Sequence, residues 1–127
     1  MMRGLLDTSV VIAESVSELP DEAAISVVTL AELHFGVHVA RDAAARRLRV
    51  RRLAEIESRF DALPVDEAVA RAYGSLAHTL RTKKRSPRPR AMDVLIAATA
   101  QVHDVPLFTL NPRDFEPFGA TIKVRAV

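Results

Sequence analysis

The sequence predicts a single α/β domain with a mostly parallel central sheet flanked by helices. Short apolar segments typical of buried strands alternate with segments whose apolar residues recur at helical spacing. Parallel neighbours need long crossovers, which the intervening helices supply. The chain has 127 residues, and a single core commonly spans about 100–150 residues. We therefore expect one domain over residues 1–127.

The first predicted strand covers residues 4–6 and stops at a polar triplet. Asp7, Thr8 and Ser9 form this triplet, and they can cap a helical turn at residues 10–13. The N-terminal segment has a basic residue and apolar stretches, but acids interrupt it early, so it does not resemble a signal peptide.

The second predicted strand, residues 24–27, leads into a helix that we expect to open at Thr29. Leu30, Leu33 and Val37 recur on one face of this helix. Further apolar residues lie off that face, which widens the apolar surface and suggests a partner surface.

The middle of the chain predicts two longer helices around a brief strand. Asp42 begins an arginine-rich helix that reaches Phe60. Residues 62–65 are a strand candidate despite Pro64, and Asp66 caps the next helix. The C-terminal part predicts, in order, a basic loop, a helix at 91–104, a strand at 105–109, a loop at 110–118 and an edge strand at 121–124.

Composition excludes several classes of protein. No cysteine is present, which excludes disulfide frameworks, thiolate zinc sites and cysteine nucleophiles and agrees with a reducing cytoplasm. No apolar run approaches the roughly 18 residues of a membrane span. We therefore expect a cytoplasmic protein that does not associate with a membrane.

The distribution of charge is more informative than its sum, which is a formal +2. Between residues 81 and 90 no acid offsets six basic residues, and Pro87 and Pro89 favour a loop there. This segment is a candidate contact for a nucleic acid. Its candidate binding residues are Lys83, Lys84, Arg85, Arg88 and Arg90. The seven arginines between residues 41 and 59 are more simply explained as a solvated helix face.

Acidic or amide side chains recur where strands end or helices begin. In an alternating strand and helix fold, such edges converge on one crevice. Clustered carboxylates repel one another, and a bound hard cation such as Mg²⁺ or Mn²⁺ resolves the repulsion. The candidate catalytic residues are Asp7, Glu32, Asp93, Asp114 and Asn111.

Each of these residues also has a structural explanation. Asp7 can simply cap a helix, and Thr29 with Glu32 matches a capping box. Asp93 can complement a helix dipole, and Asp114 can belong to a turn after a proline. Structural and ligand roles are compatible.

Four motifs together resemble the PIN-domain ribonucleases, and more narrowly the VapC-type toxins of toxin–antitoxin pairs. The motifs are Leu5-Leu6-Asp7-Thr8-Ser9-Val10, Val28-Thr29-Leu30-Ala31-Glu32-Leu33-His34-Phe35-Gly36, Ala91-Met92-Asp93-Val94-Leu95-Ile96-Ala97-Ala98-Thr99-Ala100 and Phe108-Thr109-Leu110-Asn111-Pro112-Arg113-Asp114-Phe115. Their order and spacing cover essentially the whole chain.

The resemblance implies an Mg²⁺-dependent (or Mn²⁺-dependent) endoribonuclease that hydrolyses RNA phosphodiester bonds as the toxin of a type II pair. It implies that Asp7, Glu32 and Asp93 bind the metal, with Thr8 or Ser9 alongside. The fourth position, Asn111 or Asp114, stays open, as does the number of metal ions. The implied partners are an RNA substrate, a cognate antitoxin and a second copy of the chain.

Two alternatives belong to other classes of protein. A response-regulator receiver shares the small parallel fold, but it needs an acidic pair after the first strand, where Asp7-Thr8-Ser9 supplies one acid. It also needs a lysine near the last strand, where the sequence has Thr109. The stronger alternative is a non-catalytic PIN-like module that binds an antitoxin or RNA. Stabilisation by Mg²⁺ would separate it from an enzyme.

Overall fold

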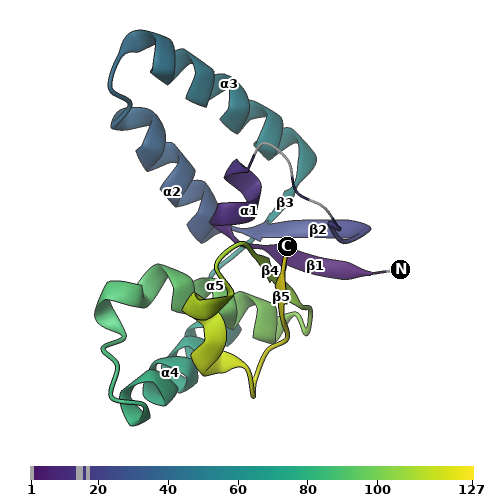
Figure 1. Cartoon of the computed structure of the whole chain (residues 1–127), viewed down its shortest axis with the longest axis vertical. Coiled ribbons are helices and arrows are strands. Elements are labelled where there is room, and N and C mark those ends of the chain that lie inside the picture. The colour runs from purple at the N-terminus through teal and green to yellow at the C-terminus, as the bar shows by residue number, and fades with distance from the viewer. Residues whose placement is uncertain (1, 14–15, 17) are drawn as a thin grey trace.

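A five-stranded parallel sheet lies between two layers of helices (Figure 1). The computed structural model describes residues 2–13, 16 and 18–127. The strand order is β3-β2-β1-β4-β5, and every neighbouring pair is parallel. The strands are β1 (Arg3–Leu6), β2 (Glu22–Ser26), β3 (Asp61–Leu63), β4 (Leu107–Thr109) and β5 (Val124–Ala126). The predicted α/β class and parallel sheet are confirmed.

The helices divide between the two faces of the sheet. Figure 1 shows α1, α2 and α3 on one side and α4 and α5 on the other. The α-helices are α1 (Thr8–Ile12), α2 (Val27–His38), α3 (Ala43–Arg59), α4 (Glu67–Thr82) and α5 (Ala91–Val102). Two 3-10 helices, η1 (Arg88–Arg90) and η2 (Pro112–Phe118), precede α5 and follow β4. Within the described residues, no helix is long and apolar enough to cross a membrane.

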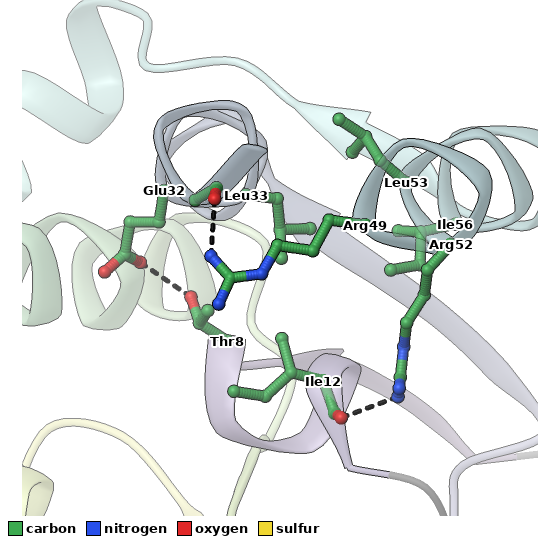
Figure 2. A pocket seen from close by; sticks show the side chains of 9 residues that line it. Thr8, Ile12, Glu32, Leu33, Arg49, Arg52, Leu53 and Ile56 are labelled. Carbon is green, nitrogen blue, oxygen red and sulfur yellow. Dashed lines mark hydrogen bonds between the residues drawn. The ribbon is translucent and has the colours of Figure 1, made fainter. Parts of the chain in front are cut away.

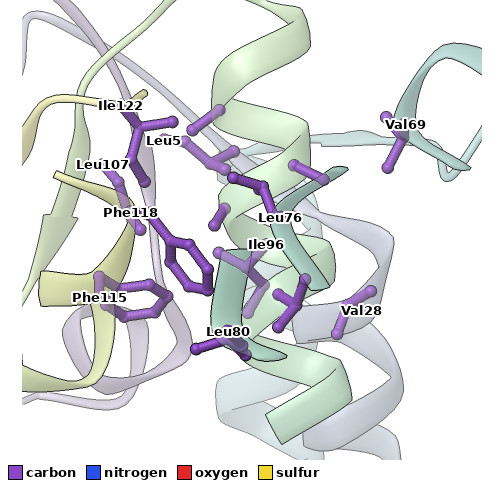
Figure 3. Packing of buried hydrophobic residues seen from close by; sticks show 14 residues of the cluster. Leu5, Val28, Val69, Leu76, Leu80, Ile96, Leu107, Phe115, Phe118 and Ile122 are labelled. Carbon is purple, nitrogen blue, oxygen red and sulfur yellow. The ribbon is translucent and has the colours of Figure 1, made fainter. Parts of the chain in front are cut away.

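Successive side chains of each central strand point to opposite faces of the sheet. Leu5 and Leu107 belong to the cluster under α4 and α5, whereas Leu6 and Phe108 belong to the cluster under α1 and α3. Figure 3 shows the first cluster, in which Phe115 and Phe118 of η2 fill the space beside Leu80. Both faces of β1 and β4 are therefore buried, and the polar residues that follow these strands are fixed by a rigid layer.

Four of the helices begin at a polar side chain that accepts a hydrogen bond from a backbone N–H. Asp7 caps α1, Asp42 caps α3 and Asp66 caps α4, as the sequence predicted. The cap of α2 is Ser26, whose Oγ accepts from the Val28 N–H at 3.0 Å.

The start of α2 corrects two expectations. The helix opens at Val27 rather than Thr29, because Ser26 at the end of β2 supplies the cap. Val27 and Val28 are β-branched and favour strands, so the sequence pattern extended the strand too far. Thr29 and Glu32 therefore form no capping box, and Glu32 lies in the second turn of the helix rather than the first.

The C-terminal elements also differ in their limits. The predicted loop at 110–118 contains η2, whose Phe115 and Phe118 are each 1% exposed. The last strand starts at Val124 because the Phe118 carbonyl accepts from the N–H groups of Thr121 and Ile122, which form a turn first. Its predicted position at the sheet edge is confirmed.

Candidate functional site

The predicted site residues come from four separate elements at the carboxyl ends of the parallel strands. Asp7 follows β1 directly, Glu32 lies on α2, and Asp93 lies in the first turn of α5. Asn111 follows β4, and Asp114 lies in the first turn of η2.

Electrostatics show that the four acids share one region. Burial raises the pKa of the Asp93 carboxyl, and the negative charge of Asp114 raises it further. The Arg90 guanidinium opposes this effect, while the charges of Glu32 and Asp7 add to it. Acids that are far apart in the sequence therefore influence one carboxyl group, which is the behaviour of a cluster.

Asp7 is held by hydroxyl groups on both of its carboxylate oxygens. Ser9 Oγ donates to Oδ1 at 2.5 Å, and Thr109 Oγ1 donates to Oδ2 at 2.6 Å. Asp7 is only 5% exposed. The next loop adds a second layer, because the Leu110 N–H donates to Ser9 Oγ and the Asn111 N–H donates to Thr109 Oγ1. These bonds fix the orientation of the Asp7 carboxylate.

The sequence did not predict Thr109 as a site residue. The one signal for it was its position, since it ends a strand beside β1 and therefore reaches the same sheet edge as Asp7. A threonine at the end of a strand is common enough that this position alone did not single it out.

Glu32 is oriented by a chain of two threonines. Thr8 Oγ1 donates to Glu32 Oε1 at 2.6 Å, which uses the only hydrogen of that hydroxyl. The Thr29 hydroxyl, 3.1 Å away, must then donate to Thr8 Oγ1. Thr29 is fully buried, so α1 and α2 hold the carboxylate between them.

Arg90 belongs to the acidic cluster rather than to a free basic loop. Its guanidinium donates to the Asp114 backbone carbonyl. It also lies 3.9 Å from Asp93 Oδ2 and 3.8 Å from Asp114 Oδ1. Only 22% of the Arg90 side chain is exposed. Arg90 thus bridges the start of α5 and η2.

The other predicted nucleic-acid-binding residues lie on the segment that leads to Arg90. Lys83 ends α4 and donates from Nζ to the Pro117 carbonyl at 2.9 Å, which ties this segment to η2. Lys84, Arg85 and Arg88 are exposed. Three positive side chains therefore stand in solvent on the segment that enters the acidic cluster.

The carboxylate oxygens of the four acids are ligands of the kind that a hard divalent cation prefers, but their side chains do not converge on one point. Among residues 2–13, 16 and 18–127, no three Asp, Glu or His side chains stand close enough to hold a metal ion. Hydroxyl groups occupy Asp7 and Glu32, and the guanidinium of Arg90 bridges Asp93 and Asp114. Asp7 Oδ1 accepts two hydrogen bonds, from Ser9 Oγ and the Val10 N–H, whereas Asp7 Oδ2 accepts one and keeps a lone pair for a ligand.

Comparison with known proteins agrees with this architecture. The PIN domain family matches residues 5–119. Ribonuclease VapC5 of Mycobacterium tuberculosis is 44% identical over 132 aligned positions, which cover 98% of this chain and 93% of that protein. Ribonuclease VapC4 of the same organism is 43% identical, with 84% and 85% covered.

A solved structure matches the whole fold. The crystal structure of VapBC-5, a member of the VapBC family of toxin–antitoxin systems from M. tuberculosis, superposes with a TM-score of 0.84 at 33% identity and covers 100% of both chains. This chain belongs to the PIN-domain family and, within it, to the VapC-type ribonucleases.

Proposed function

We propose that this chain is a divalent-metal-dependent endoribonuclease that acts as the toxin of a type II toxin–antitoxin pair. The observation that carries the proposal is the placement of Asp7, Glu32, Asp93 and Asp114 at the carboxyl ends of the parallel strands. Burial raises the pKa of Asp93, and the charges of the other three acids raise it further. Carboxylates that repel one another lower the stability of the fold. A cation that binds between these carboxylates would relieve the repulsion. Metal binding would therefore explain why the acids are clustered.

Asp7, Glu32 and Asp93 would hold Mg²⁺ or Mn²⁺, with Asp114 or Asn111 as the fourth ligand. When bound, the ion would polarise the scissile phosphodiester, lower the pKa of a water and stabilise the departing oxyanion. Asp114 is the stronger candidate for the fourth ligand because its charge reaches Asp93. Asn111 contributes its backbone N–H to the support of Asp7 through Thr109.

The remaining polar residues keep the carboxylates in place. Ser9 and Thr109 orient Asp7, and Thr8 orients Glu32. No nucleophilic side chain would be required, because a water activated by the ion would supply the nucleophile. Groups that orient ligands in this way commonly change metal affinity or activity about 10–100-fold when they are removed.

The exposed cations next to the cluster would guide the substrate. RNA phosphates are repelled by bare carboxylates, whereas Lys84, Arg85 and Arg88 attract them. Arg90 would meet the phosphate nearest the acids, a role that its contacts with Asp93 and Asp114 support. The substrate class is therefore RNA that is bound through its backbone near the sheet edge.

The protein partners follow from exposed apolar residues of α2 and from the related complexes. Phe35 is 66% exposed and Val39 is 54% exposed, so this end of the α2–α3 hairpin offers a contact surface. The similar VapBC-5 structure is that of a toxin–antitoxin system. We infer a cognate antitoxin and a homodimer as partners, a single PIN-like domain over residues 1–127, and action in the cytoplasm.

Cleavage of RNA by the purified chain tests this function. Incubation with Mg²⁺ should produce internal cuts, whereas EDTA should prevent them. Asp7→Asn and Asp93→Asn should each abolish cleavage and leave the circular dichroism spectrum unchanged. If wild-type protein neither cuts RNA nor shows a higher melting temperature with Mg²⁺ or Mn²⁺, the non-catalytic binding module is the better description.

A further inference from the structure

A pocket of about 380 Å³ lies between α1, α2 and α3 and shares a wall with the acidic cluster. Figure 2 shows the hydrogen-bonded Thr8 and Glu32 at one end of it and Arg52 at the other, with Arg49 between them. The same Thr8–Glu32 pair therefore belongs to both the candidate metal site and the pocket. A ligand in the pocket would therefore lie beside Glu32, which we propose binds the metal.

The pocket combines an apolar surface with two fixed guanidinium groups. Ile12, Leu33 and Leu53 supply part of the apolar lining. Arg49 donates to the Gly36 carbonyl at 2.5 Å, and Arg52 donates to the Ile12 carbonyl at 2.6 Å. These bonds hold the two planar groups in place. A guanidinium has five N–H donors, so each arginine keeps donors and a flat face for a ligand.

This lining suits an unstacked nucleotide of RNA. Bases that are splayed out of a single strand stack on aromatic rings or on arginine planes, and the chain has only one Tyr and five Phe to offer rings. The positive charges complement the phosphates on either side of the base. The volume lies at the lower end of the range for small-molecule sites, about 300–1,000 Å³.

We propose that this pocket is a nucleotide subsite, which binds the base of a residue flanking the scissile phosphate and so contributes to the choice of cleavage site. The inference rests on the proposed ribonuclease function. It adds a region of the chain, the inner face of the α2–α3 hairpin, that the metal site does not use.

Gly36 allows the pocket to be filled without the removal of any side chain. A Cβ added there meets Arg49 Nη1 at 3.8 Å, which is ordinary van der Waals contact. Gly36→Leu would extend a side chain from α2 into the pocket, and leucine favours a helix more than glycine does. The variant should therefore fold.

Gly74→Leu is the matched control. Gly74 is also helical and exposed, and a Cβ added there meets nothing within 4 Å. Both variants gain the same side chain within a helix, but only one of them occupies the pocket.

The experiment measures binding and base preference separately. For binding, the Asp7→Asn protein is titrated with short single-stranded RNAs that carry 2-aminopurine at successive positions. We expect one position to change in fluorescence, and addition of Gly36→Leu should weaken binding at least tenfold and remove the change. For preference, sequencing of RNA ends should show that Gly36→Leu loses discrimination at that position, whereas Gly74→Leu keeps it.

Other results would overturn the subsite. Unchanged fluorescence and unchanged base preference in Gly36→Leu would show that no base enters the pocket. If this variant loses only its affinity for the antitoxin, the pocket serves that protein instead. The binding measurement needs no catalysis, so failure of the subsite is distinguishable from failure of the nuclease function.

Discussion

The hydroxyl of Thr109 donates to Asp7 Oδ2 at 2.6 Å across 102 residues of sequence. The oxygen of that hydroxyl also accepts the Asn111 N–H at 2.9 Å. Thr109 is fully buried at the end of β4. One side chain thus joins the acid after β1 to the loop that carries Asn111 and leads to Asp114, and this link explains how the two halves of the site keep their relative position.

Replacement of Thr109 should therefore lower both stability and activity, although the change removes only one hydroxyl group. Thr109→Val keeps the shape but leaves Asp7 Oδ2 without its donor and the Asn111 N–H without an acceptor. We expect unfolding free energy to fall by about 1–3 kcal/mol and cleavage to fall about 10–100-fold. Thr109→Ser, which keeps the hydroxyl, should retain most activity. Equal activity of the Val and Ser variants, measured at the same fraction folded, would contradict this role.

The charged carboxylate of Asp93 should lower the stability of the metal-free protein at neutral pH. Its folded-state pKa is raised, so the unfolded chain releases this proton at lower pH than the folded protein does. Stability therefore falls as pH rises from the ordinary aspartate pKa to the raised value, and it stays lower above that value.

Asp93→Asn should accordingly raise the melting temperature in EDTA at pH 7, and the gain should vanish at a pH below the ordinary aspartate pKa. Asp42→Asn is the control, because Asp42 caps α3 outside the cluster and asparagine caps helices equally well. A melting temperature for Asp93→Asn at or below that of wild type at pH 7 would contradict the cost of the Asp93 charge, to which burial and the neighbouring acids contribute.

The charge of Arg90 should determine the pH below which cleavage activity falls. Its charge lowers the pKa of Asp93 against the effects of burial and the other acids. Arg90→Gln removes that charge, so the acid limb of the pH–rate profile should move to higher pH. Arg90→Lys keeps the charge and should shift it less. Arg88→Gln, at an exposed position two residues earlier, should leave the pH–rate profile unchanged. An equal shift in all three variants would contradict the specific effect of Arg90 on Asp93.

The basic segment should supply the salt dependence of RNA binding. Three exposed residues, Lys84, Arg85 and Arg88, are replaced together by alanine. If each contacts one phosphate, the slope of log K against log salt should become less steep by about 2, since single strands give roughly 0.7 per contact.

Matching alanine substitutions of Arg46, Arg47 and Arg51, which are exposed on α3, test whether that cluster is only a solvated helix face. These substitutions should leave the slope unchanged. The opposite ranking of the two triple variants would move the RNA contact from the segment after α4 to the α2–α3 hairpin.

The sequence was sufficient for the class of fold because its signals were local. Alternating apolar segments marked the order of the strands, and aspartate caps marked the starts of α3 and α4 correctly. Its errors arose where one local signal overrode another. Val27 and Val28 favoured a strand, but Ser26 started a helix, and proline with polar residues suggested a loop where the buried Phe115 and Phe118 stabilise η2.

The site was predictable only in part because its details depend on contacts between distant segments. Strand ends and helix starts pointed to Asp7, Glu32 and Asp93. The bond from Thr109 to Asp7 and the bridge from Arg90 to Asp114 join residues 102 and 24 positions apart, and no local pattern encodes them. From its charge, the sequence predicted that Arg90 belongs to the basic loop. In the structure, Arg90 instead contacts Asp93 and Asp114 within the acidic cluster.

A crystal structure with Mn²⁺, read from the anomalous scattering of the ion, tests the central claim most directly. The predicted result is density for the ion at the carboxyl edge of β1 and β4, with oxygens of Asp7, Glu32 and Asp93 around it at bond lengths close to the roughly 2.0–2.1 Å of Mg²⁺. Saturating Mn²⁺ with no ion at this edge, and with the three carboxylates still apart, would contradict a shared metal site.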